Sequence, residues 1–166
     1  MSERTVVLDH VHVQRKLQRI AHQLHEENHA EKGIVLVGIA PRGMALAQRL
    51  ASLLGPIADL EVELVELKLD KDRPLEAAVK LSVPLDGLRG HTVVLVDDVL
   101  MSGRTLMHAA AHLVTVPLKR LLTVVLVDRR HRSYPIRADI VGLTLSTTTQ
   151  EHISVELGRK DAVYLD

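Results

Sequence analysis

The sequence has no cysteine, no phenylalanine and no tryptophan. Its only tyrosines are Tyr134 and Tyr164. Without cysteine the chain forms no disulfide bond and binds no metal through thiolates, as is typical of proteins from a reducing cytoplasm. With so few aromatic rings it lacks the stacking surfaces that many proteins use to hold single-stranded nucleic acid. Its hydrophobic core must therefore be built from aliphatic side chains.

An excess of charge of one sign is also missing. Lys and Arg together number 21, and so do Asp and Glu, which gives a formal net charge of zero. No global basic field attracts nucleic acid or a membrane surface, although a local patch remains open. No apolar run is long enough to cross a bilayer, and MSERTVVLDH at the start is not a secretion signal. These absences predict a soluble, cytoplasmic protein without a membrane partner.

The length and the hydrophobic content suit one domain. At 166 residues, of which 46% are hydrophobic, the chain can bury a sizeable core. We therefore expect residues 1–166 to form a single domain.

Short apolar runs alternate with segments of helical spacing. Three runs rich in β-branched residues predict buried strands, and they lie at 34–39, 93–96 and 121–127. Apolar residues at helical spacing predict three helices. The first has its apolar positions between 13 and 24 and ends near 28–33, and the others lie at 44–54 and 106–114. This alternation predicts an α/β fold with an open, mainly parallel sheet flanked by helices. Asp9 is the expected N-cap of the first helix, and Gly55-Pro56 is the expected end of the second.

A further strand is predicted at 60–69 from the alternation of Val62, Leu64 and Leu67. Four loops follow predicted strands of this sheet, and ligands bind at the carboxyl ends of such strands. The loops begin at Gly38, Asp70, Asp97 and Asp128. The segment 70–81 is charged, contains Pro74, and is longer than the roughly 4–6 residues that are usual for a loop. It is predicted to be a lid over a site where the four loops converge.

The stretch VVLVDDVLMSGRT, from Val93 to Thr105, combines several chemical groups in one loop. A buried strand leads to Asp97 and Asp98, whose carboxylates can accept hydrogen bonds from sugar hydroxyls or hold a divalent ion. The small residues that follow let backbone N–H groups surround an anion at a helix N-terminus. A solvated turn is the alternative, but two like charges after a buried strand need a ligand or cation to offset their repulsion.

Other patterns are weaker. Gly38 to Gly43 has the spacing of neither a dinucleotide fingerprint nor a triphosphate loop, and an ordinary strand-to-helix turn also explains it. Some of the ten histidines have metal-chelating spacing on predicted helices, namely His22, His25 and His29, and His108 and His112. Nothing nearby completes a coordination shell, so we interpret them as parts of polar helix faces.

The stretch from Val93 to Thr105 resembles, throughout, the phosphoribosyl-diphosphate (PRPP) binding motif of type I phosphoribosyltransferases. The resemblance extends over nearly the whole chain to the uracil phosphoribosyltransferases that double as pyrimidine-operon attenuation regulators. It includes Arg19-Ile20-Ala21-His22, the VGIAPRG loop, and LVDRRHRSYPIRADIVG from Leu126 to Gly142. The resemblance implies the type I phosphoribosyltransferase fold, with a small C-terminal hood over the base.

The resemblance also implies a role for each loop. Ribose hydroxyls, and indirectly the Mg²⁺ bound to PRPP, would be held by Asp97 and Asp98. The 5′-phosphate would be bound by Ser102, Gly103, Arg104 and Thr105. The diphosphate would be bound by Ala40, Pro41, Arg42 and Gly43, and by Lys71 and Arg73 from a flexible flap at 70–81. The base would be contacted by Val99, Leu100, Arg129 and Ile140. The candidate catalytic residues are Asp97, Asp98 and Arg42.

The expected activity is transfer of the phosphoribosyl group of PRPP to a nucleobase, with uracil favoured and Mg²⁺ as cofactor. The alternatives are an RNA-binding pyrimidine-operon regulator that uses the pocket as a nucleotide sensor, and a purine phosphoribosyltransferase. Departures from the regulators include Ala40-Pro41 for Lys-Thr, Arg130 for Gly, and a lysine-free hood from Ser146 to His152. Several of them remove positive charge, which disfavours RNA binding. The resemblance further implies a homodimer.

Overall fold

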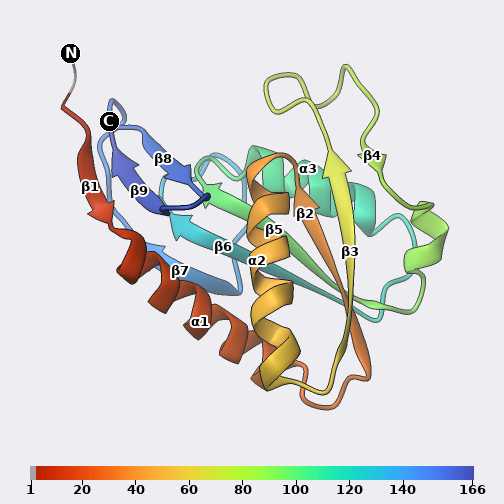
Figure 1. Cartoon of the computed structure of the whole chain (residues 1–166). Coiled ribbons are helices and arrows are strands. Elements are labelled where there is room, and N and C mark those ends of the chain that lie inside the picture. The colour runs from red at the N-terminus through yellow and green to blue at the C-terminus, as the bar shows by residue number, and fades with distance from the viewer. Residues whose placement is uncertain (1–2) are drawn as a thin grey trace.

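A six-stranded sheet forms the centre of the protein in a computed structural model that describes residues 3–166 (Figure 1). The strand order is β4-β3-β2-β5-β6-β7. The neighbouring strands from β3 to β7 are parallel, and β4 is antiparallel to β3 at one edge. The strands are β2 (Gly33–Ile39), β3 (Glu61–Lys68), β4 (Lys80–Leu81), β5 (Thr92–Leu100), β6 (Arg120–Asp128) and β7 (Ile140–Thr144). The predicted mainly parallel sheet is confirmed.

Helices cover both faces of this sheet. The helices are α1 (His10–Glu27), α2 (Arg42–Ile57) and α3 (Arg104–Leu113), with one 3-10 turn, η1 (Leu85–Leu88). Figure 1 shows α1 and α2 on the near face and α3 behind the sheet. Successive side chains of β5 alternate between the two cores: Val94 and Val96 pack with α1 and α2, while Val93 and Leu95 pack with α3. Because β5 is covered on both sides, its sequence is a continuous apolar run.

The predicted cap of α1 is confirmed, whereas the predicted end of α2 is not. The Asp9 carboxylate accepts a hydrogen bond from the His12 N–H at 2.9 Å, as expected of an N-cap. Helix α2 continues through Gly55 and Pro56 to Ile57. Proline there removes one hydrogen bond close to the helix end, and the last turn still closes because the Ala58 N–H donates to Leu54 O.

A second, three-stranded sheet forms the hood. It has the order β1-β9-β8 and is antiparallel, with β1 (Thr5–Leu8), β8 (Ile153–Glu156) and β9 (Ala162–Leu165). Asp161, which is fully buried, joins this sheet to α2 by accepting two hydrogen bonds from Arg49 at 2.8 and 2.9 Å. The β8–β9 hairpin is therefore extended by β1 and held against the helical layer.

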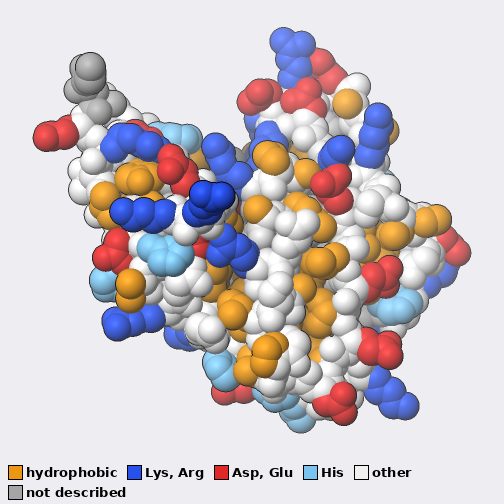
Figure 2. All heavy atoms as spheres, in the orientation of Figure 1, with side chains coloured by type: hydrophobic (Ala, Val, Ile, Leu, Met, Phe, Trp, Pro, Cys, Tyr) orange, Lys and Arg blue, Asp and Glu red, His pale blue; other side chains and the backbone are white. Residues whose placement is uncertain are grey.

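The surface seen in Figure 2 carries charges of both signs between patches of hydrophobic side chains, several of them over α2. Within residues 3–166, none of the helices combines the length and the hydropathy that a bilayer span requires.

Candidate active site

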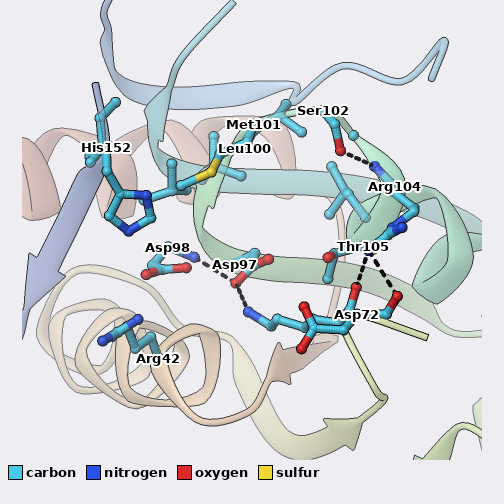
Figure 3. A pocket seen from close by; sticks show the side chains of 16 residues that line it. Arg42, Asp72, Asp97, Asp98, Leu100, Met101, Ser102, Arg104, Thr105 and His152 are labelled. Atoms are coloured by element: carbon cyan, nitrogen blue, oxygen red, sulfur yellow. Dashed lines mark hydrogen bonds and ion pairs between the residues drawn. The ribbon is translucent and has the colours of Figure 1, made fainter. Parts of the chain in front are cut away.

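A pocket of about 350 Å³ lies at the carboxyl end of β5 (Figure 3). Its walls come from the start of α2, from the flap at 70–81, from the loop between β5 and α3, and from the start of β8. The loops that follow β2, β3 and β5 therefore converge, as predicted from their places at strand ends. The fourth loop, after β6, lies beside the pocket and supports it.

Asp97 and Asp98 form the floor of the pocket, where they are only 3% and 6% exposed. The predicted strand ended before them, but β5 continues to Leu100 because its pairing with β6 extends that far. The Asp98 N–H donates to Asp97 Oδ1 at 2.9 Å, and Lys71 Nζ lies 3.6 Å from the same oxygen. Burial, and then the charge of Asp98, raise the pKa of Asp97 to about 8, although Lys71 opposes the rise. A second negative charge on this floor is therefore unfavourable in the free protein.

The loop between β5 and α3 forms an anion-binding shape. Gly103 has a φ of 87°, and a Cβ there would lie 2.7 Å from Ile136 Cγ2, so only glycine fits. The N-cap Gly103 offers no side chain to cap α3, and the Arg104 N–H makes only a long hydrogen bond, 3.3 Å, to Ser102 Oγ, so this positive end of the helix dipole suits an anion. Ser102 O accepts hydrogen bonds from the N–H groups of Ser133 and Tyr134, at 2.8 and 3.0 Å. The loop after β6 thus fixes the loop that faces the pocket.

The start of α2 forms the opposite wall, from which Arg42 points toward Asp98 (Figure 3). Two glycines allow this close approach. A Cβ on Gly38 would lie 2.5 Å from Met44 Cα, and one on Gly43 would lie 2.5 Å from Val96 O. The weak sequence signal from Gly38 to Gly43 therefore reflects close packing of α2 against β5.

Only Arg42 of the four predicted diphosphate-loop residues lines this pocket. Gly43 is buried behind it, and Ala40, joined to Pro41 by a cis peptide bond, donates its N–H to Leu67 O at 2.8 Å. Pro41 and Arg42 also line a second hollow of about 430 Å³, between α2 and the β8–β9 hairpin. Ala40, Pro41 and Gly43 thus contribute backbone that carries Arg42.

The flap contributes Lys71 and Asp72 to the pocket wall. Arg73, the other predicted flap cation, turns away: its side chain is 70% exposed and pairs with Glu76 at 3.2 Å. The side chain of Arg104 donates to the backbone of the flap, at 2.7 Å from Lys71 O and 3.2 Å from Asp72 O. The predicted lid is thus attached to α3, the helix that follows the anion-binding loop.

Two of the four predicted base-contacting residues, Val99 and Leu100, line the pocket. The other two lie elsewhere. Ile140 is 3% exposed and packs in the core, because β7 is a covered strand. Arg129 donates to Thr147 Oγ1 and to Thr148 O, so its guanidinium holds the loop before β8.

Sequence reasoning missed His152, whose imidazole points into the pocket near Asp98 (Figure 3). The backbone of His152 pairs with Asp166 in both directions, at 3.0 and 2.8 Å, which fixes its position at the start of β8. A signal for it exists in the sequence. Ile153 and Val155 are buried, so strand alternation turns residues 152 and 154 to the other face of β8.

Comparisons with known proteins agree with this architecture. The sequence profile of the phosphoribosyl transferase domain matches residues 4–161. Two relatives, described as bifunctional protein PyrR, come from Bacillus cereus strain AH820 and Bacillus thuringiensis subsp. konkukian strain 97-27. Each is 40% identical over 171 residues, which cover 97% of this chain and 94% of the relative.

Solved structures are similar in fold. The hypoxanthine phosphoribosyltransferase of Trypanosoma cruzi superimposes with a TM-score of 0.80 and 16% identity, covering 96% of this chain and 95% of that one. A hypoxanthine-guanine phosphoribosyltransferase of Bacillus anthracis gives 0.74 and 20%, covering 89% and 86%. At these identities the likeness concerns the fold alone.

Proposed function

Because the chain belongs to the phosphoribosyltransferase family, we propose that it transfers the phosphoribosyl group of PRPP to uracil and releases diphosphate and the nucleoside monophosphate. The observation that best supports this is the buried pair of Asp97 and Asp98 beside the N-terminus of α3. Paired carboxylates suit ribose hydroxyls, and an uncapped helix N-terminus suits a phosphate. PRPP carries both groups on one molecule.

Each wall of the pocket has a proposed part in binding PRPP. Asp97 and Asp98 accept hydrogen bonds from the ribose hydroxyls. The first N–H groups of α3, with the hydroxyls of Ser102 and Thr105, hold the 5′-phosphate. Arg42 faces the diphosphate from the opposite wall, together with a flap cation.

The reaction depends on charge stabilisation more than on a protein nucleophile. As C1′ separates from the diphosphate, the ribose becomes cation-like and the leaving group gains negative charge. In the proposed pose, Asp97 and Asp98 lie beside the ribose, while Arg42 and Lys71 lie beside the leaving group. The flap excludes the water that would otherwise hydrolyse PRPP.

Mg²⁺ fits the carboxylate pair as an ion that arrives with PRPP. Within residues 3–166 no group of three or more His, Cys, Asp and Glu side chains is arranged to hold a metal. Asp97 and Asp98 offer the hard oxygen ligands that Mg²⁺ prefers, and the pKa of Asp97, raised by burial and then by the charge of Asp98, is one that a cation would lower. When bound, the ion would neutralise part of the diphosphate charge.

Uracil is proposed on the resemblance to uracil phosphoribosyltransferases and on the 40% identity to the PyrR relatives. The hypoxanthine phosphoribosyltransferases share the fold at 16–20% identity, which keeps a purine as the alternative base. We propose that Val99, Leu100 and His152 contact the base, since they line the pocket near Asp98.

A base-panel assay tests the proposal. The purified protein is given PRPP, Mg²⁺ and, separately, uracil, cytosine, hypoxanthine or guanine, and release of diphosphate is measured. We expect turnover with uracil. Turnover with a purine alone would reassign the base, whereas no turnover and no PRPP binding would reject the enzyme.

Asp98→Asn provides the matched variant. It keeps the size of the side chain but removes the charge that faces the ribose, so kcat/KM should fall by about 10²-fold or more. The thermal midpoint should not decrease, because the loss of one of two neighbouring buried charges relieves repulsion. A fully active variant would contradict the assigned role.

RNA binding is the second candidate, because the 40% identical relatives are described as bifunctional. The balanced charge of this chain predicts that such binding is weak. The test is titration of a pyrimidine-operon leader RNA at several salt concentrations. Tight binding with a steep salt dependence would favour the regulator.

We extend the proposal to three properties of the whole protein. Residues 1–166 act as one domain, two copies form a homodimer, and the protein works in the cytoplasm, where the sequence composition led us to expect it. Light scattering tests the dimer at micromolar concentration. A monomer mass there would reject it.

A further inference from the structure

We propose that Arg104 is a positioning residue. Its guanidinium holds the first residues of the flap (70–81) over the pocket and does not bind the 5′-phosphate. This inference rests on the proposed function for its kinetic readout only. Its main readout is the mobility of the flap in the ligand-free protein.

The backbone and the side chain of Arg104 make contacts with different parts of the protein. The backbone N–H faces the anion-binding loop, 3.3 Å from Ser102 Oγ. The guanidinium instead donates through Nη2 to two consecutive flap carbonyls, at 2.7 Å from Lys71 O and 3.2 Å from Asp72 O. Hydrogen bonds from a charged donor are among the stronger ones in proteins. The backbone N–H therefore bonds within the anion-binding loop, while the side chain is engaged by the flap.

The flap has few other attachments along its length. Its ends are held by Leu69 and Val79, which pack against the core under α3, and by the pairing of β4 with β3. Between these ends, Leu75 is 86% exposed. Within residues 3–166, the recorded polar contacts from 70–79 to another element come from Arg104 and from the Lys71–Asp97 ion pair. The tether from Arg104 thus acts where packing is sparse.

The tether also fixes Lys71 in relation to the acidic floor. The residue whose carbonyl accepts from Arg104 at 2.7 Å is the same one whose Nζ lies 3.6 Å from Asp97 Oδ1. Holding the Lys71 backbone limits where its ammonium can reach. Loss of the tether should therefore weaken both PRPP binding and the stabilisation of the leaving group, through a misplaced Lys71.

Hydrogen exchange with Arg104→Met tests the tether directly. Methionine keeps most of the side-chain length but donates no hydrogen bond. Amides in 70–79 of the ligand-free variant should exchange about tenfold faster or more, because local opening becomes easier. Arg104→Lys, which still donates, should show a smaller increase. Arg89→Met is the matched control: it removes an exposed arginine paired with Asp86 and should leave flap exchange unchanged.

Ribose 5-phosphate binding separates the tether from a phosphate ligand. Its Kd for Arg104→Met should stay within about twofold of the wild-type value, since the guanidinium is not placed on the phosphate. A loss of about tenfold or more, or unchanged flap exchange, would overturn the inference. In the active enzyme, kcat/KM for PRPP should fall several-fold, because Lys71 no longer lies where it faces the diphosphate. An inactive wild-type protein would reject the proposed function, yet the exchange and binding measurements would still decide the role of Arg104.

Discussion

Asp97 is a buried residue whose position destabilises the ligand-free protein but suits a bound ligand. Its carboxylate is 3% exposed beside Asp98, and burial with that neighbour raises its pKa to about 8. The partial compensation comes from Lys71, whose side chain is itself 40% exposed. A site built for stability alone would not pair two carboxylates in this way. A ligand that binds together with a cation explains the pair better.

Asp97→Asn should stabilise the metal-free, ligand-free protein. Between the ordinary pKa of 3.8 and about 8, folded Asp97 holds a proton that the unfolded chain releases. The free energy of unfolding of the wild type should therefore fall as pH rises through this window, by at most about 1.4 kcal/mol per pH unit. The variant should lack this contribution and lose activity. Urea unfolding at pH 5, 7 and 9 in EDTA measures it; equal pH profiles would contradict the buried-pair explanation.

At the scale of the elements, the approach of α2 to β5 determines where Arg42 points. Gly43, the second residue of this helix, has no room for a side chain, since a Cβ would meet Val96 O and Asp97 Cα at 2.5 and 3.0 Å. Both neighbours are backbone atoms of a central strand and cannot move independently. The helix and the acidic floor are thus placed by one close contact.

Gly43→Ala should therefore destabilise the protein by about 1–3 kcal/mol and reduce activity, because α2 must shift away from β5. Gly55→Ala is the matched control in the same helix, where nothing lies within 4 Å of the added Cβ. It should be neutral or stabilising by up to about 1 kcal/mol. Urea denaturation of both variants gives the comparison, and equal effects would rule out the close contact as the cause.

An ion pair between Asp161 and Arg49 holds the hood against α2. Burial alone would raise the pKa of Asp161, but hydrogen bonds from Arg49 and the Gly158 N–H lower it. A lowered pKa stabilises the fold above the ordinary value and loses that effect as pH falls through the folded value. The tie is therefore intact at neutral pH.

Arg49→Met should cost about 2 kcal/mol of unfolding free energy at pH 7, because Asp161 is left buried without its cation. The loss should shrink in acid, because Asp161 takes up a proton in the variant and no charge is then left without its cation. Thermal melts at pH 7 and pH 3.5 measure both values. A loss that is independent of pH would show that packing, rather than charge, holds the hood.

The elements were largely predictable because their signals are local in sequence. The apolar run at 93–96 and the helical spacing in 13–24 each record which face is buried. Directions of loop side chains were not predictable, because their partners are distant in the sequence. Arg104 meets carbonyls more than 30 residues earlier, and Arg129 meets Thr148 across 19 residues. His152 was hidden for the same reason: its position depends on pairing with Asp166.

At the scale of the whole molecule, three loops from one sheet and one strand from a second sheet line a single pocket. A ligand that touches all of them should bind only the folded state and stabilise it as a unit. The balanced net charge gives no long-range attraction for such an anionic ligand, so local groups must supply it.

PRPP with Mg²⁺, at 100 times its Kd, should raise the free energy of unfolding by about 2.7 kcal/mol. The expected melt is one cooperative transition that moves as a whole, in keeping with the proposed single domain. Differential scanning calorimetry measures the shift, and Asp98→Asn should show little of it. Two separate transitions, of which one ignores PRPP, would contradict the single domain.

The exposed position of Leu75 has a practical consequence for spectroscopy. Because the chain contains no tryptophan, Leu75→Trp would give it one indole, located in the flap. At a position that is 86% exposed, its fluorescence would start at the long wavelengths of an indole in water. Any shift to shorter wavelengths would then report the flap alone, without a signal from the core to subtract.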